Sequence, residues 1–299
     1  MEYPHASVLL DEVVAYLRPE NGGTYLDGTI GAGGHSEKIL ELGGQKVRVI
    51  GLDQDENALE ISKKRLEKHG ERLVLIRSDY RDLAGALSKA GAKGLDGALL
   101  DLGVSSMQLD EPARGFSFKA DGPLDMRLGS SGPTAADWLA RADRREIERV
   151  LYTYGEERYG RRIAEAIVRE RSIEPIRTTG RLAAIVSSAV PAAYRHGRIH
   201  PATRTFQALR IVVNDELGAL KDFLAGVPEH LRPAARVAII SFHSLEDRIV
   251  KHAFREWQKQ GLGRVLTKKP VVASDAEQDR NARSRSAKLR VFEKDGGGR

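Results

Sequence analysis

Short runs of apolar residues without polar alternation recur through the first hundred positions of the chain. These runs end near Leu26, Leu52, Ile76 and Leu100. Unbroken apolar runs are typical of strands that are buried on both faces of a parallel sheet. Segments with helical periodicity separate the runs; in the segment 55–68 the apolar positions fall near one face, and Gly70 is placed to end the helix. The alternation predicts a doubly wound α/β domain.

The pattern changes after the fourth run. The segment 103–133 contains glycine, serine, proline and charged residues with little periodicity, and apolar residues then recur at i, i+3, i+4 and i+7 from about 147 to 224. That spacing indicates amphipathic helices. We therefore predict a helical insertion at 106–214 within an α/β domain formed by residues 1–105 and 215–299.

Sheet periodicity returns towards the C-terminus. An apolar run at 237–242 predicts a fifth buried strand, followed by a helix from about 244 to 258. Two further extended runs, near 265–272 and 289–292, are placed to complete the sheet. The polar and basic segment 273–286 between them is predicted to be a mobile linker.

The composition narrows the class of protein. The 299 residues include no cysteine, which excludes disulfides, Cys-ligated metal sites and covalent catalysis by a thiolate. The net charge of +6 fits an anionic partner such as nucleic acid. No apolar run approaches the roughly 18 residues that span a bilayer, and the acidic N-terminal segment lacks the features of a signal peptide. We therefore expect a cytoplasmic protein without membrane contact.

A glycine-rich loop from Gly28 to Gly34 lies between the first predicted strand and the first predicted helix. Glycines there allow a tight turn and a close approach of the backbone to a ligand. Asp53 ends the second strand about 22 residues after Gly31, the distance at which an acid takes ribose hydroxyls in nucleotide sites. Because ligands of open α/β sheets bind at the carboxyl ends of strands, the pattern predicts a nucleotide-type site. The simpler alternative is a turn beside solvated acids.

The charges near this loop bear on the identity of the ligand. A dinucleotide site requires G-x-G-x-x-G, and here Ser36 stands at the third glycine position. Asp27 would repel a pyrophosphate, whereas it suits the ammonium and sulfonium groups of S-adenosylmethionine. Asp79 and Tyr80, after the third strand, suit the amino group and the ring face of adenine. These residues favour S-adenosylmethionine as the cofactor, with a nicotinamide-dependent oxidoreductase as the alternative.

Asp101 follows the fourth strand, where many amino-group methyltransferases carry an acid or amide before a Pro-Pro-aromatic sequence. An exocyclic amine conjugated to a base is a poor nucleophile and needs an acceptor for its N–H as it attacks the methyl group. Asp101 is therefore the candidate catalytic residue. The Pro-Pro-aromatic part is absent, so a cofactor-binding role and a solvated strand end stay as alternatives.

Several residues near the predicted site have two interpretations each. Phe116 or Phe118 can stack on an extruded base, or can anchor the insertion to the core. Ser244 with Asp247 predicts a capping box at the helix after the fifth strand. His243 beside it is placed to contact substrate or to move a proton, or has a capping and packing role. His196 and His200 are four residues apart, but Gly197 and Pro201 disfavour a regular helix and no third ligand is evident, so we expect no metal site there.

Basic residues gather in the predicted insertion and in the C-terminal portion. They are Arg158, Arg161 and Arg162, then Arg195, Arg198, Arg204 and Arg210, and finally Lys268, Lys269, Arg280, Arg283, Arg285, Lys288 and Arg290. Arginine pairs well with phosphates. The second and third groups have few neighbouring acids, so we expect them to contact RNA, with solvated helix faces as the alternative.

On these residues the chain resembles the 16S ribosomal RNA cytosine-N4 methyltransferases of the RsmH (MraW) type, over nearly its whole length. The motifs that carry the resemblance are His5–Leu10, Asp27–Ser36, Asp101–Gln108, Arg114–Phe118, Gly122–Arg127, His200–Arg204, Ser241–Arg248 and Asn281–Arg290. So many long motifs in one order make the resemblance specific.

The resemblance implies a Rossmann-like class I methyltransferase α/β fold with an inserted all-helical domain that would recognise RNA. It implies methyl transfer from S-adenosylmethionine to N4 of a cytidine in the decoding (P-site) region of 16S rRNA, in the assembled small ribosomal subunit. Carried over by motif, the cofactor contacts would be Gly33, Gly34, His35, Asp53, Tyr80, Asp101 and Gln108. A homodimer, and a non-catalytic RNA-binding assembly factor that has kept the pocket, are left open.

The absence of cysteine agrees with this chemistry. Cytosine C5 methylation in the usual RNA enzymes proceeds through a thiolate adduct at C6, which this chain cannot form. Attack by an exocyclic amine needs no such nucleophile. The lack of cysteine therefore separates the two cytosine chemistries and favours N4.

Overall fold

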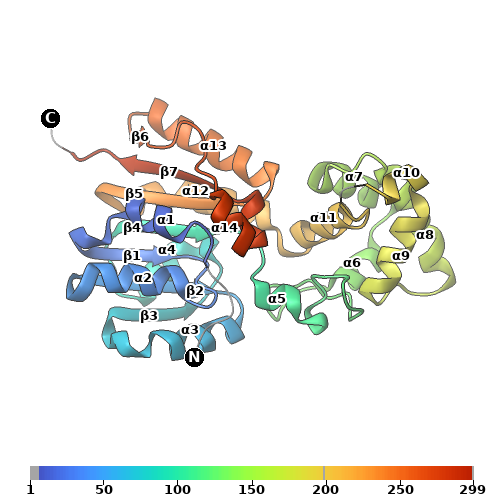
Figure 1. Cartoon of the computed structure of the whole chain (residues 1–299), viewed down its shortest axis with the longest axis horizontal. Coiled ribbons are helices and arrows are strands. Elements are labelled where there is room, and N and C mark those ends of the chain that lie inside the picture. Colours follow the sequence, from blue (N-terminus) through green and yellow to red (C-terminus); the bar gives the residue numbers. More distant parts are fainter. Residues whose placement is uncertain (1–6, 198, 298–299) are drawn as a thin grey trace. The chain divides into compact units, whose positions relative to one another are not determined.

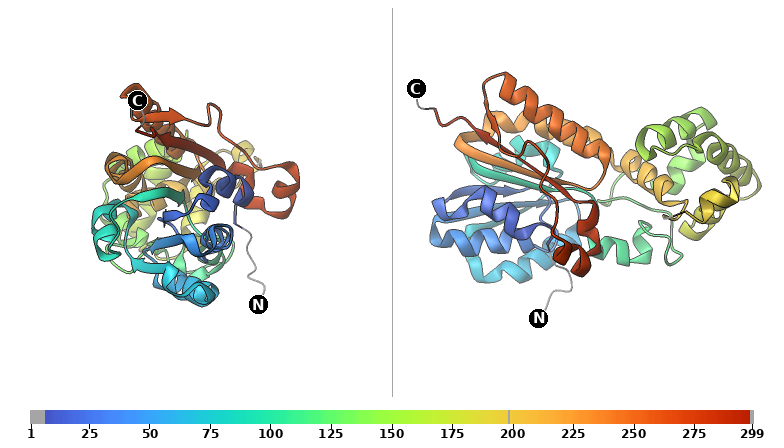
Figure 2. Two further views of the ribbon diagram at one scale, coloured as in Figure 1. Left: turned by 90° about the vertical axis from the view of Figure 1, so that its left-hand side faces the viewer. Right: turned by 45° about the horizontal axis from the view of Figure 1, so that its top comes forward.

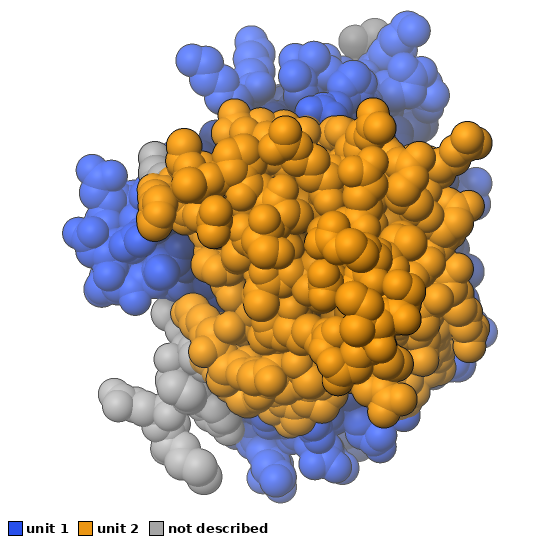
Figure 3. Space-filling view, turned by 90° about the vertical axis from the view of Figure 1, so that its right-hand side faces the viewer, with its two compact units in different colours: residues 1–103, 217–299 blue, residues 104–216 orange. Residues whose placement is uncertain are grey.

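The computed structural model describes residues 7–197 and 199–297, which form two compact units (Figures 1 and 3). The first unit contains residues up to 103 and from 217 onwards, and the second runs from 104 to 216. His5, Ala6 and Arg198, which belong to motifs and clusters named above, lie outside the described residues. Among the helices of the described part, none is both long and apolar enough to cross a membrane.

The first unit contains a seven-stranded sheet with the order β3-β2-β1-β4-β5-β7-β6 (Figure 1). The strands are β1 Gly23–Asp27, β2 Val47–Asp53, β3 Leu73–Arg77, β4 Leu95–Asp101, β5 Leu231–Ser241, β6 Gly263–Val265 and β7 Lys288–Lys294. The first five are parallel, and β7 is antiparallel to both of its neighbours. This order is that of the Rossmann-like class I S-adenosylmethionine-dependent methyltransferases, so the predicted fold class is confirmed.

Helices cover both faces of this sheet (Figure 2). They are α1 Leu10–Leu17, α2 Gly34–Gly43, α3 Glu56–Leu66, α4 Leu83–Lys89, α12 Glu216–His230, α13 Ser244–Lys259 and α14 Asp275–Arg280. Residues of α4, α12 and α13 form one buried cluster with alternate strand residues such as Leu26 and Leu100. Residues of α1 and α2 form a second cluster with the intervening residues, such as Tyr25 and Leu99. Because both faces are covered, most residues of β2 and β4 and the last seven of β5 are buried in succession, which explains their unbroken apolar runs. The edge strand β3 is only half-buried.

The cap of α13 differs from the predicted one. His243, and not Ser244, is the N-cap residue, and its partner in the capping box is Glu246 instead of Asp247. The backbone of His243 is extended, with φ −137° and ψ 166°, so its ring reaches the first free N–H groups of the helix. Asp247 instead accepts a hydrogen bond from Arg290 at 2.6 Å. The predicted capping box was therefore wrong by one residue.

The segment 273–286, predicted to be a mobile linker, is structured. It contains α14 and a 3-10 turn at Ala282–Ser286, and Ala273 and Ala287 at its ends are buried in the core cluster of α1 and α2. Glu277 accepts a hydrogen bond from the backbone N–H of Leu9 at 2.8 Å. The preceding extended run was also only partly correct, because β6 ends at Val265. These contacts fix a segment whose polar composition alone suggested mobility.

The second unit is helical and has its own core. Its helices are α5 Ser106–Asp110, α6 Ala135–Arg141, α7 Arg144–Gly155, α8 Gly160–Ile173, α9 Thr179–Ala189, α10 Ala192–Arg195 and α11 Thr203–Asn214. Ile147, Ile163 and Leu209, from the predicted apolar faces, are buried in this core. Phe116 is buried there too, and the Phe118 ring lies 4.8 Å from that of Phe206. Phe116 is therefore part of the second unit's own core, and its anchoring of the insertion to the α/β domain stays a prediction.

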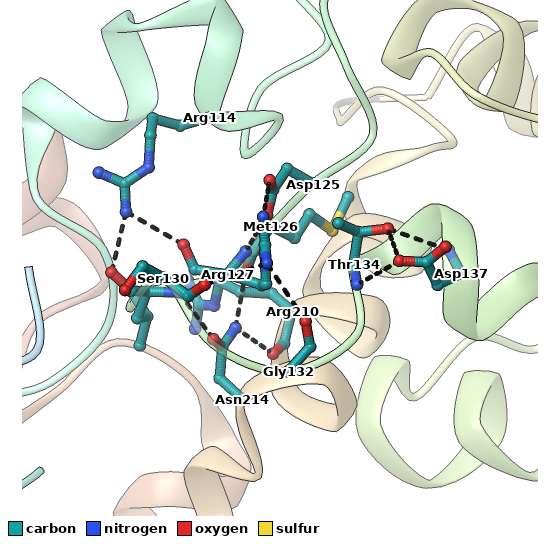
Figure 4. A network of polar contacts seen from close by, with 11 residues as sticks. Arg114, Asp125, Met126, Arg127, Ser130, Gly132, Thr134, Asp137, Arg210 and Asn214 are labelled. Carbon is teal, nitrogen blue, oxygen red and sulfur yellow. Dashed lines mark hydrogen bonds and ion pairs between the residues drawn. The ribbon is translucent and has the colours of Figure 1, made fainter.

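The loop between α5 and α6 is held by polar contacts (Figure 4). Arg114 donates hydrogen bonds to the carbonyl oxygens of Arg127 and Leu128, at 3.0 and 2.9 Å. Arg127 forms a bidentate ion pair with Asp125, at 2.7 and 2.8 Å. Asn214 of α11 accepts from the N–H of Leu128 at 2.8 Å and donates to a further loop carbonyl. Side-chain hydrogen bonds thus add to the few backbone pairs of this loop, such as that from the N–H of Met126 to the carbonyl of Arg114 at 3.0 Å.

Candidate functional site

The glycine loop is held between the ends of β2 and β4. The N–H of Gly28 donates to the carbonyl of Leu99 at 2.9 Å, and the N–H of Ile30 donates to that of Leu52 at 2.9 Å. A Cβ at Gly28 would lie 2.4 Å from a methyl carbon of Leu100, so no larger residue fits without displacement. Gly33, with φ +81°, caps α2 without a side chain. The sequence needs glycine here because strand, loop and helix approach each other closely.

Asp53 at the end of β2 is joined to this loop. One carboxylate oxygen accepts from the N–H of Gly31 at 3.0 Å, and the other accepts from the N–H of Asp55 at 2.9 Å. Burial raises the pKa of Asp53 to about 6, although both hydrogen bonds oppose the rise. Each oxygen keeps a lone pair for a further donor. Asp53 therefore keeps acceptor capacity beside the loop, and its contact with ribose hydroxyls stays a prediction.

Asp27 lies beneath the loop and is only 2% exposed. Its carboxylate accepts a hydrogen bond from the Ser36 hydroxyl at 2.6 Å and one from the N–H of Thr29 at 3.3 Å. Burial raises its pKa, and the hydrogen bond from Ser36 opposes the rise. Ser36, considered in the sequence only as a departure from the dinucleotide motif, thus ties the first turn of α2 to the end of β1. Asp27 acts on a ligand only through its charge.

Asp101 ends β4 beside the same loop. Its N–H donates to the Thr29 hydroxyl at 2.7 Å. Its Oδ1 atom is buried and has no hydrogen-bond partner among the described residues. Burial raises the pKa of Asp101, while the nearby charges of His35 and Arg283 lower it. A buried acceptor without a donor costs free energy and marks a place where a ligand N–H can bind.

Tyr80 and His35 lie next to the loop in different ways. The Cβ atom of Tyr80 would be 3.2 Å from a Cβ placed on Gly28, and its ring packs edge-on against Phe223 at 5.9 Å. The His35 ring is buried, with Nε2 3.0 Å from the carbonyl oxygen of Val8. Tyr80 therefore keeps a position suited to a ligand ring. The His35 side chain contacts Val8, so only the backbone of His35 is available for a ligand contact.

Gln108 lies in the second unit. It belongs to the capping box of α5: its side chain accepts from the N–H of Ser105 at 3.0 Å, and its own N–H donates to the Ser105 hydroxyl at 3.2 Å. The other predicted cofactor residues share the carboxyl edge of the sheet in the first unit: Gly33, Gly34, His35, Asp53, Tyr80 and Asp101. A cofactor contact by Gln108 stays a prediction.

Arg283 is a residue of this edge that the sequence did not reveal. Its guanidinium lies 5.3 Å from the ring centre of Phe242, and its charge acts on Asp101. The sequence suggested only that Arg283 contacts RNA as part of a basic C-terminal portion. The antiparallel return of β7 brings this segment back to the ends of β4 and β5. No local spacing signals this proximity; only its membership of a long motif distinguishes it from other arginines.

Comparisons with known proteins cover almost the whole chain. Residues 2–295 match the model of the MraW methylase family. The "Ribosomal RNA small subunit methyltransferase H" of Anaeromyxobacter sp. (strain Fw109-5) is 51% identical over 98% of each chain. The protein of the same name from Heliobacterium mobile is 48% identical over 98% of this chain and 100% of its own.

Solved structures are similar at a lower level. An rRNA methylase from Streptococcus thermophilus aligns with a TM-score of 0.40 and 13% identity, over 96% of this chain and 94% of its own. The N-methyltransferase NodS from Bradyrhizobium japonicum, solved with S-adenosyl-l-homocysteine, has a TM-score of 0.43 and 8% identity, over 95% and 85% of the two chains. The two sequence relatives each cover 98% of this chain, so their match includes both units.

Proposed function

Because the chain belongs to the MraW methylase family, we propose that it transfers a methyl group from S-adenosylmethionine to the exocyclic N4 of a cytidine in 16S rRNA. The proposed target lies in the decoding (P-site) region of the assembled small ribosomal subunit. The names of the relatives support the small-subunit rRNA as substrate. The observation that carries the N4 assignment is the buried Asp101 Oδ1, an acceptor that lacks a donor among the described residues.

The residues at the edge of the sheet fit S-adenosylmethionine. Asp53 would accept the ribose hydroxyls, and Tyr80 would face the adenine ring. The space beside Gly31 is open, since a Cβ there would meet only the carbonyl oxygen of Thr29, at 3.9 Å. When bound, the cofactor supplies a methyl group activated by a sulfonium. The backbone of Gly33, Gly34 and His35, with Asp101 and Gln108, would complete the contacts.

The same edge argues against a dinucleotide. The carboxylates of Asp27, Asp53 and Asp101 lie at three strand ends around the loop. A pyrophosphate at this loop would face all three, whereas a cationic ligand is attracted by them. The nicotinamide-dependent alternative therefore has weaker support from the charges of the site.

Asp101 performs the central step in this proposal. The amine of cytosine is a weak nucleophile, because its lone pair is delocalised into the ring. Asp101 Oδ1 accepts a hydrogen bond from N4, holds the amine in line with the methyl group, and stabilises the positive charge that develops on the nitrogen. The carboxylate then takes the proton that N4 loses. Thr29 keeps Asp101 in place through the backbone N–H of that residue.

Mass spectrometry of treated RNA tests the reaction. Small ribosomal subunits lacking the modification would be incubated with the protein and isotope-labelled S-adenosylmethionine, and the RNA digested to nucleosides. We expect the label on N4 of one cytidine. Label on C5 or on a ribose would contradict the proposal. Isothermal calorimetry distinguishes the methyltransferase from the oxidoreductase, because a methyltransferase should bind S-adenosylmethionine and not NAD.

A basic and aromatic cluster on the second unit supports its proposed role in binding RNA. The Arg158 guanidinium lies 4.9 and 4.8 Å from the ring centres of Tyr159 and Tyr194. The Tyr194 hydroxyl donates to the buried carboxylate of Glu157 at 2.7 Å, which fixes its ring. Arg162, also exposed, lies 5.9 Å from the Tyr159 ring. Arginine and aromatic rings held together in this way suit phosphates and unpaired bases.

Salt dependence tests this cluster. Replacing Arg158 and Arg162 by alanine should weaken binding to the small subunit and lower the slope of log K against log salt by about 1 for each phosphate that the variant no longer neutralises. Arg161→Ala is the matched control, since Arg161 is paired with Glu165 at 3.0 Å and should contribute less. Equal slopes for all variants would show that RNA binds elsewhere.

A further inference from the structure

The ring of His243 is held in one orientation by the start of α13. Its Nδ1 atom accepts a hydrogen bond from the backbone N–H of Glu246, at 3.4 Å. A backbone N–H can only donate, so Nδ1 carries no proton. The proton of the neutral ring is therefore on Nε2. The capping box thus selects one tautomer of His243.

The Nε2–H group of His243 is buried without an acceptor. It has no hydrogen-bond partner among the described residues, and the side chain is 10% exposed. Glu246 Oε1 lies 3.3 Å from Nε2 but not in hydrogen-bond geometry. The other oxygen of Glu246 accepts from the N–H groups of Phe242 and His243, at 2.9 and 3.3 Å. Glu246 therefore orients the ring and leaves its donor available.

This donor and the Asp101 acceptor come from neighbouring strands. Asp101 at the end of β4 is in register with Ile240 of β5, and the N–H of Leu102 donates to the carbonyl of Ile240 at 3.0 Å. His243 follows two residues after the end of β5. The charge of Glu246, its capping partner, acts on Asp101. The carboxyl edge thus holds one buried acceptor and one buried donor, each without a partner among the described residues.

We propose that Asp101 and His243 together recognise the edge of the target base, and that His243 determines specificity. Asp101 Oδ1 accepts from the exocyclic amine, and His243 Nε2–H donates to the adjacent ring nitrogen, N3 of cytosine. Uracil presents an acceptor at position 4 and a donor at N3, which is the reverse pattern. The pair therefore selects an amino base over an oxo base. This inference rests on the proposed function and adds a residue that senses N3.

Two variants separate this role from helix capping. His243→Asn keeps a side-chain oxygen that caps a helix well but lacks a donor at the position of Nε2. His243→Ala lacks both. We expect kcat/KM for the small subunit to fall about 10- to 100-fold in both variants, because neither has a donor at the position from which Nε2–H reaches N3. Only His243→Ala should show a lower Tm. Wild-type kcat/KM in His243→Asn would overturn the inference.

A base analogue tests the contact with N3 directly. Small subunits reconstituted with 3-deazacytidine at the target keep the exocyclic amine but replace the N3 acceptor with C–H. The wild-type protein should lose about the same factor of 10 to 100 on this substrate, whereas His243→Asn should lose nothing further. If the wild type is fully active on cytidine, but the losses from His243→Asn and from 3-deazacytidine add to each other, this inference alone would be overturned. A wild type that labels no cytidine N4 would overturn the proposed function and this inference with it.

Discussion

Carboxylates in two regions of this chain have pKa values shifted in opposite directions. At the carboxyl edge of the sheet, burial raises the pKa values of Asp27, Asp53 and Asp101. In the loop of the second unit, Asp125 is also partly buried, but the hydrogen bonds and charge of Arg127 lower its pKa below the ordinary value. The direction of the shift depends on the hydrogen-bond partners. The edge carboxylates accept from backbone N–H groups or a hydroxyl, or have an oxygen without a donor among the described residues, whereas Asp125 accepts from a charged guanidinium.

The comparison separates two uses of a buried charge. The loop of the second unit uses its carboxylate to hold Arg127, whose guanidinium also donates to the carbonyl oxygens of Ser130 and Gly132, and these contacts stabilise the loop (Figure 4). The edge of the sheet retains carboxylates that lower its stability when ionised. Groups of this kind are typical of ligand sites, where the ligand supplies the missing partner. We therefore expect the edge of the sheet, and not the loop of the second unit, to bind the cofactor and the base.

The largest effect should come from Asp101→Asn. The amide has nearly the same shape but cannot take a proton from N4, so methyl transfer should fall at least about 100-fold. The free energy of unfolding should stay the same or rise at pH 8, because a buried charge is removed. Radiolabel incorporation into small subunits and urea denaturation measure the two quantities.

The matched control is Asp125→Asn, a change of the same atoms in the other region. It should retain methyl transfer. If Asp101→Asn also retains wild-type turnover, Asp101 does not accept the proton from N4. The opposite pKa shifts of the two regions would then be unrelated to catalysis.

The pH dependence of the free energy of unfolding should reveal the titration of Asp53 when the wild type is compared with Asp53→Asn. Its pKa is about 6 in the folded protein and 3.8 without the fold, so the carboxyl favours the folded state when protonated. That contribution is present below pH 3.8 and is lost as the pH rises through 6. At about 1.4 kcal/mol for each pH unit, the loss is about 3 kcal/mol.

Asp53→Asn does not titrate, so its stability relative to the wild type should rise by about 3 kcal/mol between pH 3 and pH 8. Urea denaturation of both proteins at four pH values measures this difference. Parallel pH profiles would show that Asp53 is not perturbed by burial.

The smallest effect should come from breaking the loop of the second unit. Asp125→Asn removes a bidentate ion pair, and the free energy of unfolding at pH 7 should fall by about 1–2 kcal/mol. Because the folded pKa of Asp125 is lowered, this loss should disappear as the pH falls below 3.8. Calorimetry should show unchanged affinity for S-adenosylmethionine. A weaker affinity would mean that this loop contributes to the cofactor site.

The sequence predicted the sheet well because its signals are local. Three of the first four apolar runs end at an acid, and parallel strands bring their carboxyl ends to one edge, so Asp53 and Asp101 were expected to lie together. The cap of α13 was missed because His243 and Ser244 both have suitable side chains and acids at the right spacing. Only the end of β5 at Ser241 decides between them.

The amino-acid sequence by itself determined most of the helices and strands, though not α14 or the end of β6, together with the fold class and the set of polar groups at the strand ends. These follow from periodicity and from the geometry of parallel strands. The tertiary structure alone decided which atoms of those groups have partners. Asp27 is satisfied by Ser36, whereas Asp101 Oδ1 and His243 Nε2 have no partner among the described residues. Burial and hydrogen bonding depend on neighbours far apart in the chain, which no local pattern encodes.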